Sequence, residues 1–135
     1  MIRAVLDTNV FVSAFLLTGR LNRLVPLILK KKFLWLFSQE ILEEYLAVAS
    51  RPLYGLSVEK VELLLYQVKE HAEWVNVRSR FTVVAEDPAD DQFIACAVDG
   101  RADWIVTGDR HLLGLKTFRG IQIGAPAEFL KVLPE

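Results

Sequence analysis

The chain opens with the stretch Ile2-Arg3-Ala4-Val5-Leu6-Asp7-Thr8-Asn9-Val10, and this stretch indicates the class of fold. Residues 2–6 form a short apolar run without helical periodicity, which is typical of a buried strand. Asp7, Thr8 and Asn9 follow directly, and these residue types favour the start of a helix. We therefore expect a strand over residues 2–6 and a helix over about residues 10–17.

The same alternation of apolar runs with amphipathic stretches continues along the chain. Further strands are expected over residues 33–37, 104–106 and 120–123, and over at least one of the segments 74–77 and 81–84. Further helices are expected over residues 21–29, from the N-cap Ser38 to Ala49, from the N-cap Ser57 to about Val68, over 90–98, briefly near Leu112, and after Pro126. Short strands that alternate with helices predict a parallel sheet covered on both faces.

The composition limits the class of protein further. The chain has 135 residues, of which 53% are hydrophobic, and 16 basic residues stand against 17 acidic ones. A chain of this size buries about two-thirds of its unfolded surface, which supports one domain over residues 1–135. The single cysteine, Cys96, excludes an intrachain disulfide and favours a cytoplasmic location. Asp7 interrupts the first apolar run, so a signal peptide is not expected. No stretch approaches the roughly 20 apolar residues of a membrane span, so a membrane partner is not expected either.

Several acidic residues far apart in the chain are expected at one edge of this sheet. Asp7 directly follows the strand over residues 2–6, and Asp109 follows the strand over 104–106. Asp90 and Asp91 begin a helix that runs antiparallel to the strand after it, so the start of that helix points to the same edge. In parallel α/β sheets, ligands bind outside the carboxyl ends of the strands.

A further carboxylate is expected from the helix that follows Ser38. Glu43 and Glu44 lie on opposite flanks of the apolar arc of that helix, and the helical phase favours Glu44 slightly. Carboxylates gathered at one place repel one another unless a cation compensates, and hard oxygen ligands suit Mg²⁺ or Mn²⁺. Such a site polarises a phosphodiester and activates water for its hydrolysis. Each motif alone has a simpler interpretation as a helix cap, a turn or a solvated helix face; their convergence favours the site.

Four segments carry a further signal through their order and spacing. They are residues 4–14 (AVLDTNVFVSA), 38–45 (SQEILEEY) with Ser50-Arg51-Pro52, 87–95 (DPADDQFIA) and 106–109 (VTGD). Together they cover nearly the whole chain. In this pattern the chain resembles the PIN-domain family, and broadly its VapC-like members, which are the toxins of bacterial and archaeal toxin–antitoxin pairs.

The resemblance implies a PIN-like three-layer sandwich with a parallel central sheet of about five strands. It also implies a nuclease that cleaves single-stranded RNA with one or two Mg²⁺ or Mn²⁺ ions. The catalytic acids that it implies are Asp7, Glu44, Asp91 and Asp109, of which Asp7, Asp91 and Asp109 hold the metal. Two choices between neighbours stay open, namely Glu43 or Glu44 and Asp90 or Asp91.

The resemblance also assigns supporting residues and partners. Thr8 and Asn9 resemble family residues that orient the first aspartate, and Thr107 resembles a hydroxyl beside the last one. The implied partners are RNA, a cognate antitoxin protein and a second copy of the chain in a homodimer or larger homo-oligomer.

Binding an RNA backbone requires cations. The candidates are Arg110, which lies nearest to the acids, the run Lys30-Lys31-Lys32, and Arg20 and Arg23. The lysine run also suits the C-terminal end of a helix in solvent. The three tryptophans, Trp35, Trp74 and Trp104, lie in or near apolar strands, which favours core packing over base stacking.

Two other functions fit a parallel sheet with acids at its edge. A receiver-type phosphoacceptor domain needs a lysine after a late strand, and residues 121–124 offer none. A degenerate PIN-fold module would bind nucleic acid or protein without cleavage, but all four acids are present here.

The charged residues are distributed unevenly along the chain. Residues 1–80 carry 11 basic and 8 acidic groups, whereas residues 81–135 carry 5 basic and 9 acidic groups. The acids therefore concentrate where a cation site is predicted.

Overall fold

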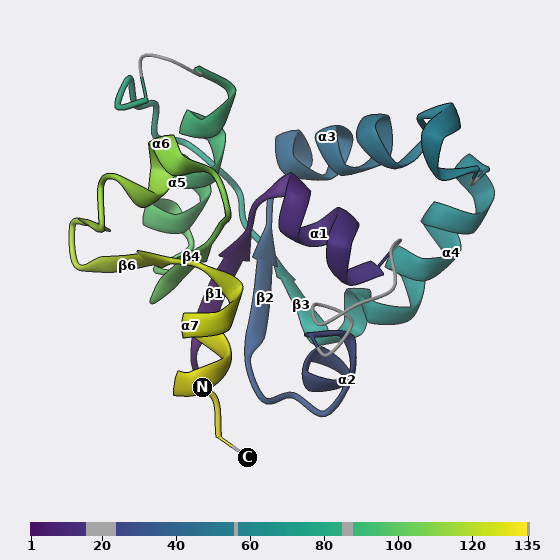
Figure 1. The fold of residues 1–135 in the computed structure, drawn as a ribbon, viewed down its shortest axis with the longest axis horizontal. Coiled ribbons are helices and arrows are strands. Elements are labelled where there is room, and N and C mark those ends of the chain that lie inside the picture. The colour runs from purple at the N-terminus through teal and green to yellow at the C-terminus, as the bar shows by residue number, and fades with distance from the viewer. Residues whose placement is uncertain (16–23, 56, 85–87, 135) are drawn as a thin grey trace.

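A six-stranded sheet forms the centre of the molecule (Figure 1). The computed structural model describes residues 1–15, 24–55, 57–84 and 88–134. The strands follow the order β3-β2-β1-β4-β6-β5 across the sheet, and their bounds are β1 Arg3–Leu6, β2 Leu34–Phe37, β3 Ala72–Trp74, β4 Trp104–Val106, β5 Thr117–Phe118 and β6 Ile121–Gly124. All neighbouring pairs are parallel except β5 with β6. The expected parallel sheet is therefore confirmed, with a short antiparallel strand added at one edge.

The added strand β5 belongs to a tight hairpin. Arg119 and Gly120 lie between its strands with φ angles of 50° and 82°. Two consecutive residues in the left-handed region are typical of a type I′ turn, whose twist matches that of the paired strands. The sequence predicted a strand at residues 120–123 but not β5, because a strand of two residues shows no alternation that could be detected.

The helices occupy the positions that the apolar periodicity predicts. Their bounds are α1 Thr8–Phe15, α2 Leu24–Leu29, α3 Gln39–Ala49, α4 Val58–Val68, α5 Asp91–Asp99, α6 Arg110–Leu113 and α7 Pro126–Val132. Ser38 and Ser57 cap α3 and α4 as expected, since each side chain accepts a hydrogen bond from the amide three residues further on. Residues 16–23, which include parts of two expected helices as well as Arg20 and Arg23, lie outside the described residues.

Helices cover both faces of the sheet. Trp35 of β2 and Trp104 of β4 lie level with the same residue of β1 and therefore share one face. On that face Trp35 packs against aromatic rings of α1 and α3, and Trp104 packs against Phe129 of α7. Leu36 points to the opposite face, where it lies close to Gly100 at the end of α5. These layers on either side of the sheet confirm the three-layer sandwich.

The segment after β3 departs from the sequence-based prediction. A strand was expected within residues 74–77 or 81–84, but β3 ends at Trp74. Residues 77–84, which we call the strap, form no helix or strand. Four of the strap's backbone amides donate to carboxylates of α5 instead of to a neighbouring strand. The strap is therefore held by side chains, which apolar patterning does not reveal.

Trp74 also differs from its expected place in the core. Its side chain is 50% exposed on β3, the strand at one edge of the sheet, whereas Trp35 is fully buried. None of the described helices is both long enough and apolar enough to cross a membrane.

Candidate nuclease site at the carboxyl edge of the sheet

Asp7 stands at the end of the central strand β1 and at the start of α1. Its side chain is only 4% exposed. One carboxylate oxygen, Oδ1, accepts a hydrogen bond from the amide of Val10 at 2.8 Å, which caps α1. This cap explains why α1 begins at Thr8, two residues before the predicted start. The other oxygen, Oδ2, accepts a hydrogen bond from the hydroxyl of Thr107.

Thr107 connects Asp7 to the neighbouring strand end. Its side chain is fully buried directly after β4, and its hydroxyl oxygen accepts a hydrogen bond from the amide of Asp109 at 2.9 Å. The Asp109 carboxylate is half-buried and caps the short helix α6 by accepting from the amide of His111 at 2.7 Å. The predicted neighbours Asp7, Thr107 and Asp109 therefore lie together at the ends of adjacent strands.

The electrostatic environment of Asp7 opposes its ionisation. Burial raises the pKa of Asp7 above its ordinary value, and the negative charge of Asp109 raises it further. Hydrogen bonds from Thr107, Val10 and Gly108 lower the pKa without cancelling the rise. A cation between these carboxylates would favour their charged forms.

The predicted helical glutamate reaches the same edge through Thr8. The Thr8 hydroxyl donates a hydrogen bond to the carboxylate of Glu44 on α3, and Glu44 is half-buried. Glu43 is exposed and accepts instead from the side chain of Gln39 at 3.0 Å. The next residue, Tyr45, donates through its buried hydroxyl to the carbonyl of Leu6 in β1. Between the two neighbouring glutamates, the structure therefore places Glu44 beside the residues that follow β1.

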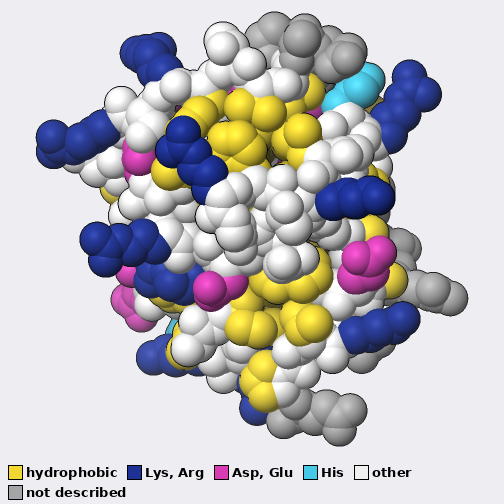
Figure 2. Space-filling model, turned by 90° about the vertical axis from the view of Figure 1, so that its left-hand side faces the viewer, with side chains coloured by type: hydrophobic (Ala, Val, Ile, Leu, Met, Phe, Trp, Pro, Cys, Tyr) yellow, Lys and Arg dark blue, Asp and Glu magenta, His cyan; other side chains and the backbone are white. Residues whose placement is uncertain are grey.

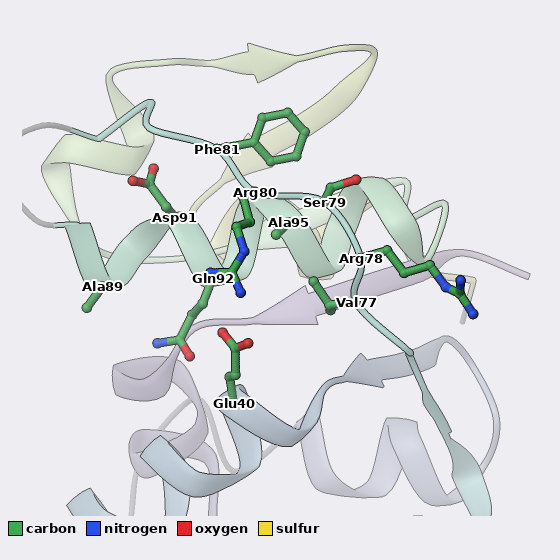
Figure 3. Close-up of a pocket in the computed structure, with 10 residues that line it drawn as sticks. All are labelled: Glu40, Val77, Arg78, Ser79, Arg80, Phe81, Ala89, Asp91, Gln92 and Ala95. Atoms are coloured by element: carbon green, nitrogen blue, oxygen red, sulfur yellow. The ribbon is translucent and has the colours of Figure 1, made fainter.

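The neighbouring acids Asp90 and Asp91 have different surroundings. Asp90 ends a 3₁₀ turn immediately before α5 and is only 7% exposed. The Oδ1 atom of Asp91 accepts hydrogen bonds from the amides of Val83 and Val84 at 3.0 and 2.9 Å. Figure 3 shows the Asp91 carboxylate pointing away from Glu40, toward the strap. One oxygen of Asp91 therefore holds the strap.

The donor set suits a divalent cation. Asp7 and Asp109 interact electrostatically, Glu44 is linked to Asp7 through the adjacent Thr8, and carboxylate oxygens are the ligands that Mg²⁺ and Mn²⁺ prefer. Within the described ranges, no group of three or more His, Cys, Asp or Glu side chains is placed so that it could hold a metal ion. The chemistry of these carboxylates suits a cation, but the described side chains are not gathered around one point.

The predicted RNA-binding residues divide between the carboxyl ends and the amino ends of the parallel strands. Arg110 is exposed and directly follows Asp109, so it lies beside the acids. Lys30, Lys31 and Lys32 precede β2 and line a hollow with Met1 and Asp103, at the opposite edge of the sheet. On the side of the molecule shown in Figure 2, basic side chains surround separate apolar patches and form no continuous stripe. Asn9 is exposed on α1.

Sequence reasoning passed over the basic residues of the strap. Arg78 and Arg80 are exposed there, and they line a pocket together with Glu40 and Gln92. The apolar residues of this segment predict a strand, and that prediction gives its arginines no role in binding. The signal in the sequence was the spacing of Arg78 and Arg80, two residues apart and shortly before the acidic segment 87–95.

The comparison with known families agrees with this geometry. Residues 3–111 match the family profile described as PIN domain, which is most of the 135-residue chain. The chain therefore belongs to the PIN-domain family, a superfamily of nucleases that generally use divalent metals. Membership of this family suggests nucleic acid as the ligand class. No curated protein gave a significant match.

Proposed function

We propose that this chain is a Mg²⁺- or Mn²⁺-dependent endoribonuclease that hydrolyses phosphodiester bonds of single-stranded RNA. The observation that carries the proposal is the network in which Thr107 joins Asp7 to Asp109 at two adjacent strand ends. Burial and the negative charge of Asp109 raise the pKa of Asp7, so ionised Asp7 is costly to the fold, and a bound cation would offset that cost.

The ligand set that we propose is Asp7, Asp109 and one acid from the start of α5, with Glu44 acting directly or through water. The sequence pattern favoured Asp91 as the acid from α5. We propose Asp90 instead, because its side chain is buried, as that of Asp7 is, whereas the Asp91 carboxylate points toward the strap and binds two of its amides. The hydroxyls of Thr107 and Thr8 orient Asp7 and Glu44.

A divalent cation bound by these acids would polarise the phosphodiester and stabilise the leaving oxygen. The protein's own contribution is to hold the carboxylates in fixed orientations before RNA arrives. Val10 and Thr107 each bind one oxygen of Asp7, so its carboxylate cannot rotate freely. Arg110, next to Asp109, supplies an exposed positive charge for a phosphate.

The test is RNA cleavage by the purified chain and by variants of each acid. We expect cleavage with Mg²⁺ or Mn²⁺, none with a chelator, and none from Asp7→Asn, Asp90→Asn or Asp109→Asn. Asp91→Asn and Glu43→Gln are the matched neighbours and should retain most of the activity. Equal activity in Asp7→Asn would contradict the site, and loss in Asp91→Asn with retention in Asp90→Asn would return the third position to Asp91.

We further propose that the chain is the toxin of a toxin–antitoxin pair, acting in the cytoplasm as a homodimer or larger homo-oligomer that a cognate antitoxin inhibits. The support is the VapC-like order of the four motifs. Induced expression of the wild-type chain in a bacterial host should arrest growth, whereas expression of Asp7→Asn at the same level should not. Unimpaired growth with the active enzyme present would contradict the toxin role.

A further inference from the structure

The strap is fastened to α5 at both of its ends. Asp99, at the end of α5, accepts hydrogen bonds from the amides of Arg78 and Ser79 at 2.6 and 2.7 Å, and from the Ser79 hydroxyl at 2.6 Å. Asp91, at the start of α5, accepts from the two amides near the other end of the strap. The strap backbone is therefore fixed along the helix, and side chains between the anchors can be presented in a defined position.

A pocket lies between the strap and the first turns of α3 and α5. Its volume is about 340 Å³, within the range of roughly 300 to 1,000 Å³ that is typical of small-ligand sites. Arg80 enters it from the strap, Glu40 from α3 and Gln92 from α5 (Figure 3). Ala95 and Phe81 add apolar surface to the lining.

Three of the polar side chains that line this pocket are left without a partner among the described residues. Among the described residues, neither Arg80, Glu40 nor Gln92 makes a side-chain hydrogen bond or an ion pair. Figure 3 shows the guanidinium of Arg80 and the carboxylate of Glu40 approaching each other from opposite sides of the pocket. The pocket thus offers a planar donor group, an acceptor group and an amide to a ligand.

These groups suit an uncharged polar ring better than a phosphate. The carboxylates of Glu40 and Asp91 balance the charges of Arg78 and Arg80 at the pocket, so its lining carries no net positive charge for a phosphate, whereas a base edge presents donors and acceptors side by side. Guanine matches best, because its N1–H and exocyclic amino group can both donate to a carboxylate. Its O6 and N7 atoms accept from arginine in the most common specific contact to that base.

We propose that this pocket binds one unpaired guanine base of the RNA beside the phosphodiester that is cleaved; this proposal rests on the function proposed above. The pocket shares its helices with the candidate acids. Glu40 precedes Glu44 by one turn of α3, about 6 Å along the helix axis, and Gln92 follows Asp90 by two residues. A strand seated with its phosphate at the acids therefore passes the pocket with an adjacent nucleotide.

Sequence selection in the cleavage reaction tests the proposal. A pool of RNAs with a randomised single-stranded segment is cleaved with Mg²⁺, and the fragment ends are sequenced. We expect guanine to be enriched at one position next to the cut. Glu40→Gln and Arg80→Ala should reduce that enrichment on the order of tenfold. Glu59→Gln, in the first turn of α4, and Arg51→Ala, beyond the far end of α3, are matched controls that should preserve it.

Binding of guanosine itself, followed by NMR without metal, separates the pocket from the cleavage activity. Guanosine carries no phosphate, so we expect it to bind the wild-type chain more tightly than adenosine does and to lose affinity in Glu40→Gln. Guanosine binding without RNA cleavage would support the pocket and contradict the proposed function. RNA cleavage without base preference, or a loss in Arg80→Ala that is equal for all bases, would overturn the pocket and leave the nuclease in place.

Discussion

The Thr107 hydroxyl holds the Asp7 carboxylate and the Asp109 backbone in place at the ends of two adjacent strands. Thr107→Val keeps the shape of the side chain but removes the donor to Asp7 and the acceptor for the Asp109 amide. We expect the free energy of unfolding to fall by about 1–3 kcal/mol, because buried polar groups lose their partners. RNA cleavage should also fall, because the Asp7 carboxylate loses its orientation.

Urea denaturation and cleavage rates measure these two effects. Thr117→Val, at an exposed position of β5, is the matched control and should leave both unchanged. Wild-type stability together with wild-type cleavage in Thr107→Val would contradict the positioning role.

Asp7 gives a pH-dependent prediction for the metal-free protein. Because burial raises its pKa in the folded state, ionised Asp7 destabilises the fold. The protein should therefore lose stability as the pH rises from the unfolded-state value of about 3.9 through the higher folded-state pKa. Asp7→Asn removes this ionisation, so it should be more stable than the wild type at pH 7.

Denaturation curves with chelator at pH 7 and at pH 4 provide the measurement. The advantage of Asp7→Asn should shrink as the pH falls through the folded-state pKa, and it should vanish below the unfolded-state value of about 3.9, where Asp7 is protonated in both states. An Asp7→Asn variant that is less stable than the wild type at pH 7 would show that ionised Asp7 carries no such penalty.

At this scale, the sequence predicted where most of the acids lie but not what each carboxylate contacts. Asp7 and Asp109 follow strands that prove to be adjacent, so the order of apolar runs was enough to place them together. Asp91 differs, because its Oδ1 binds amides of Val83 and Val84 in a segment without periodicity. Whether Asp91 binds a metal stays a prediction, as it does for the other acids, and the cleavage assay tests it.

At the scale of elements, the anchoring of the strap by Asp99 can be tested through stability. Burial acts to raise the pKa of Asp99, but hydrogen bonds from Ser79 and Arg78 outweigh it and hold the pKa below the ordinary value. Ionised Asp99 therefore stabilises the folded state. Asp99→Ala should lower the free energy of unfolding by about 1 kcal/mol at pH 7.

The sign of the pH dependence follows from the lowered pKa. The contribution of Asp99 is complete above the unfolded-state value of about 3.9 and disappears as the pH falls through the folded-state pKa. The gap between the wild type and Asp99→Ala should therefore persist at pH 6 and close below pH ~4. Glu62→Ala, at an exposed position of α4, is the control. An equal fall in its free energy of unfolding would mean that the effect of Asp99→Ala comes from the removal of a charge and not from the loss of the strap anchor.

Elements with strong local signals were predicted well. Helix α3 begins and ends as the N-cap Ser38 and the apolar arc indicate. The strand β3 was placed two residues too late, because its residues are half-exposed at a sheet edge and carry no clear alternation. Tertiary hydrogen bonds, and not local preference, decide the conformation of the strap that follows.

At the scale of the whole molecule, Cys96 reports on the integrity of the core. It lies fully buried in α5, and burial raises the pKa of its thiol to about 12. A thiol reagent at pH 8 should therefore modify the folded protein only as fast as the core opens. The modification rate should rise with urea in parallel with unfolding. Rapid modification of a protein with intact near-ultraviolet circular dichroism would show that α5 separates from the sheet without global unfolding.

The uneven distribution of charge links the fold to the proposed cation. Residues 81–135 carry 9 acidic and 5 basic groups, and one of those acids, Asp109, interacts electrostatically with Asp7. A cation that binds only the folded state stabilises it by about 2.7 kcal/mol at a concentration 100 times its dissociation constant. Mg²⁺ or Mn²⁺ should therefore raise the midpoint of thermal unfolding of the wild type, and by less in Asp7→Asn. Sodium chloride at matched ionic strength is the control for screening, and an equal shift with that salt would mean that the acids hold no specific cation.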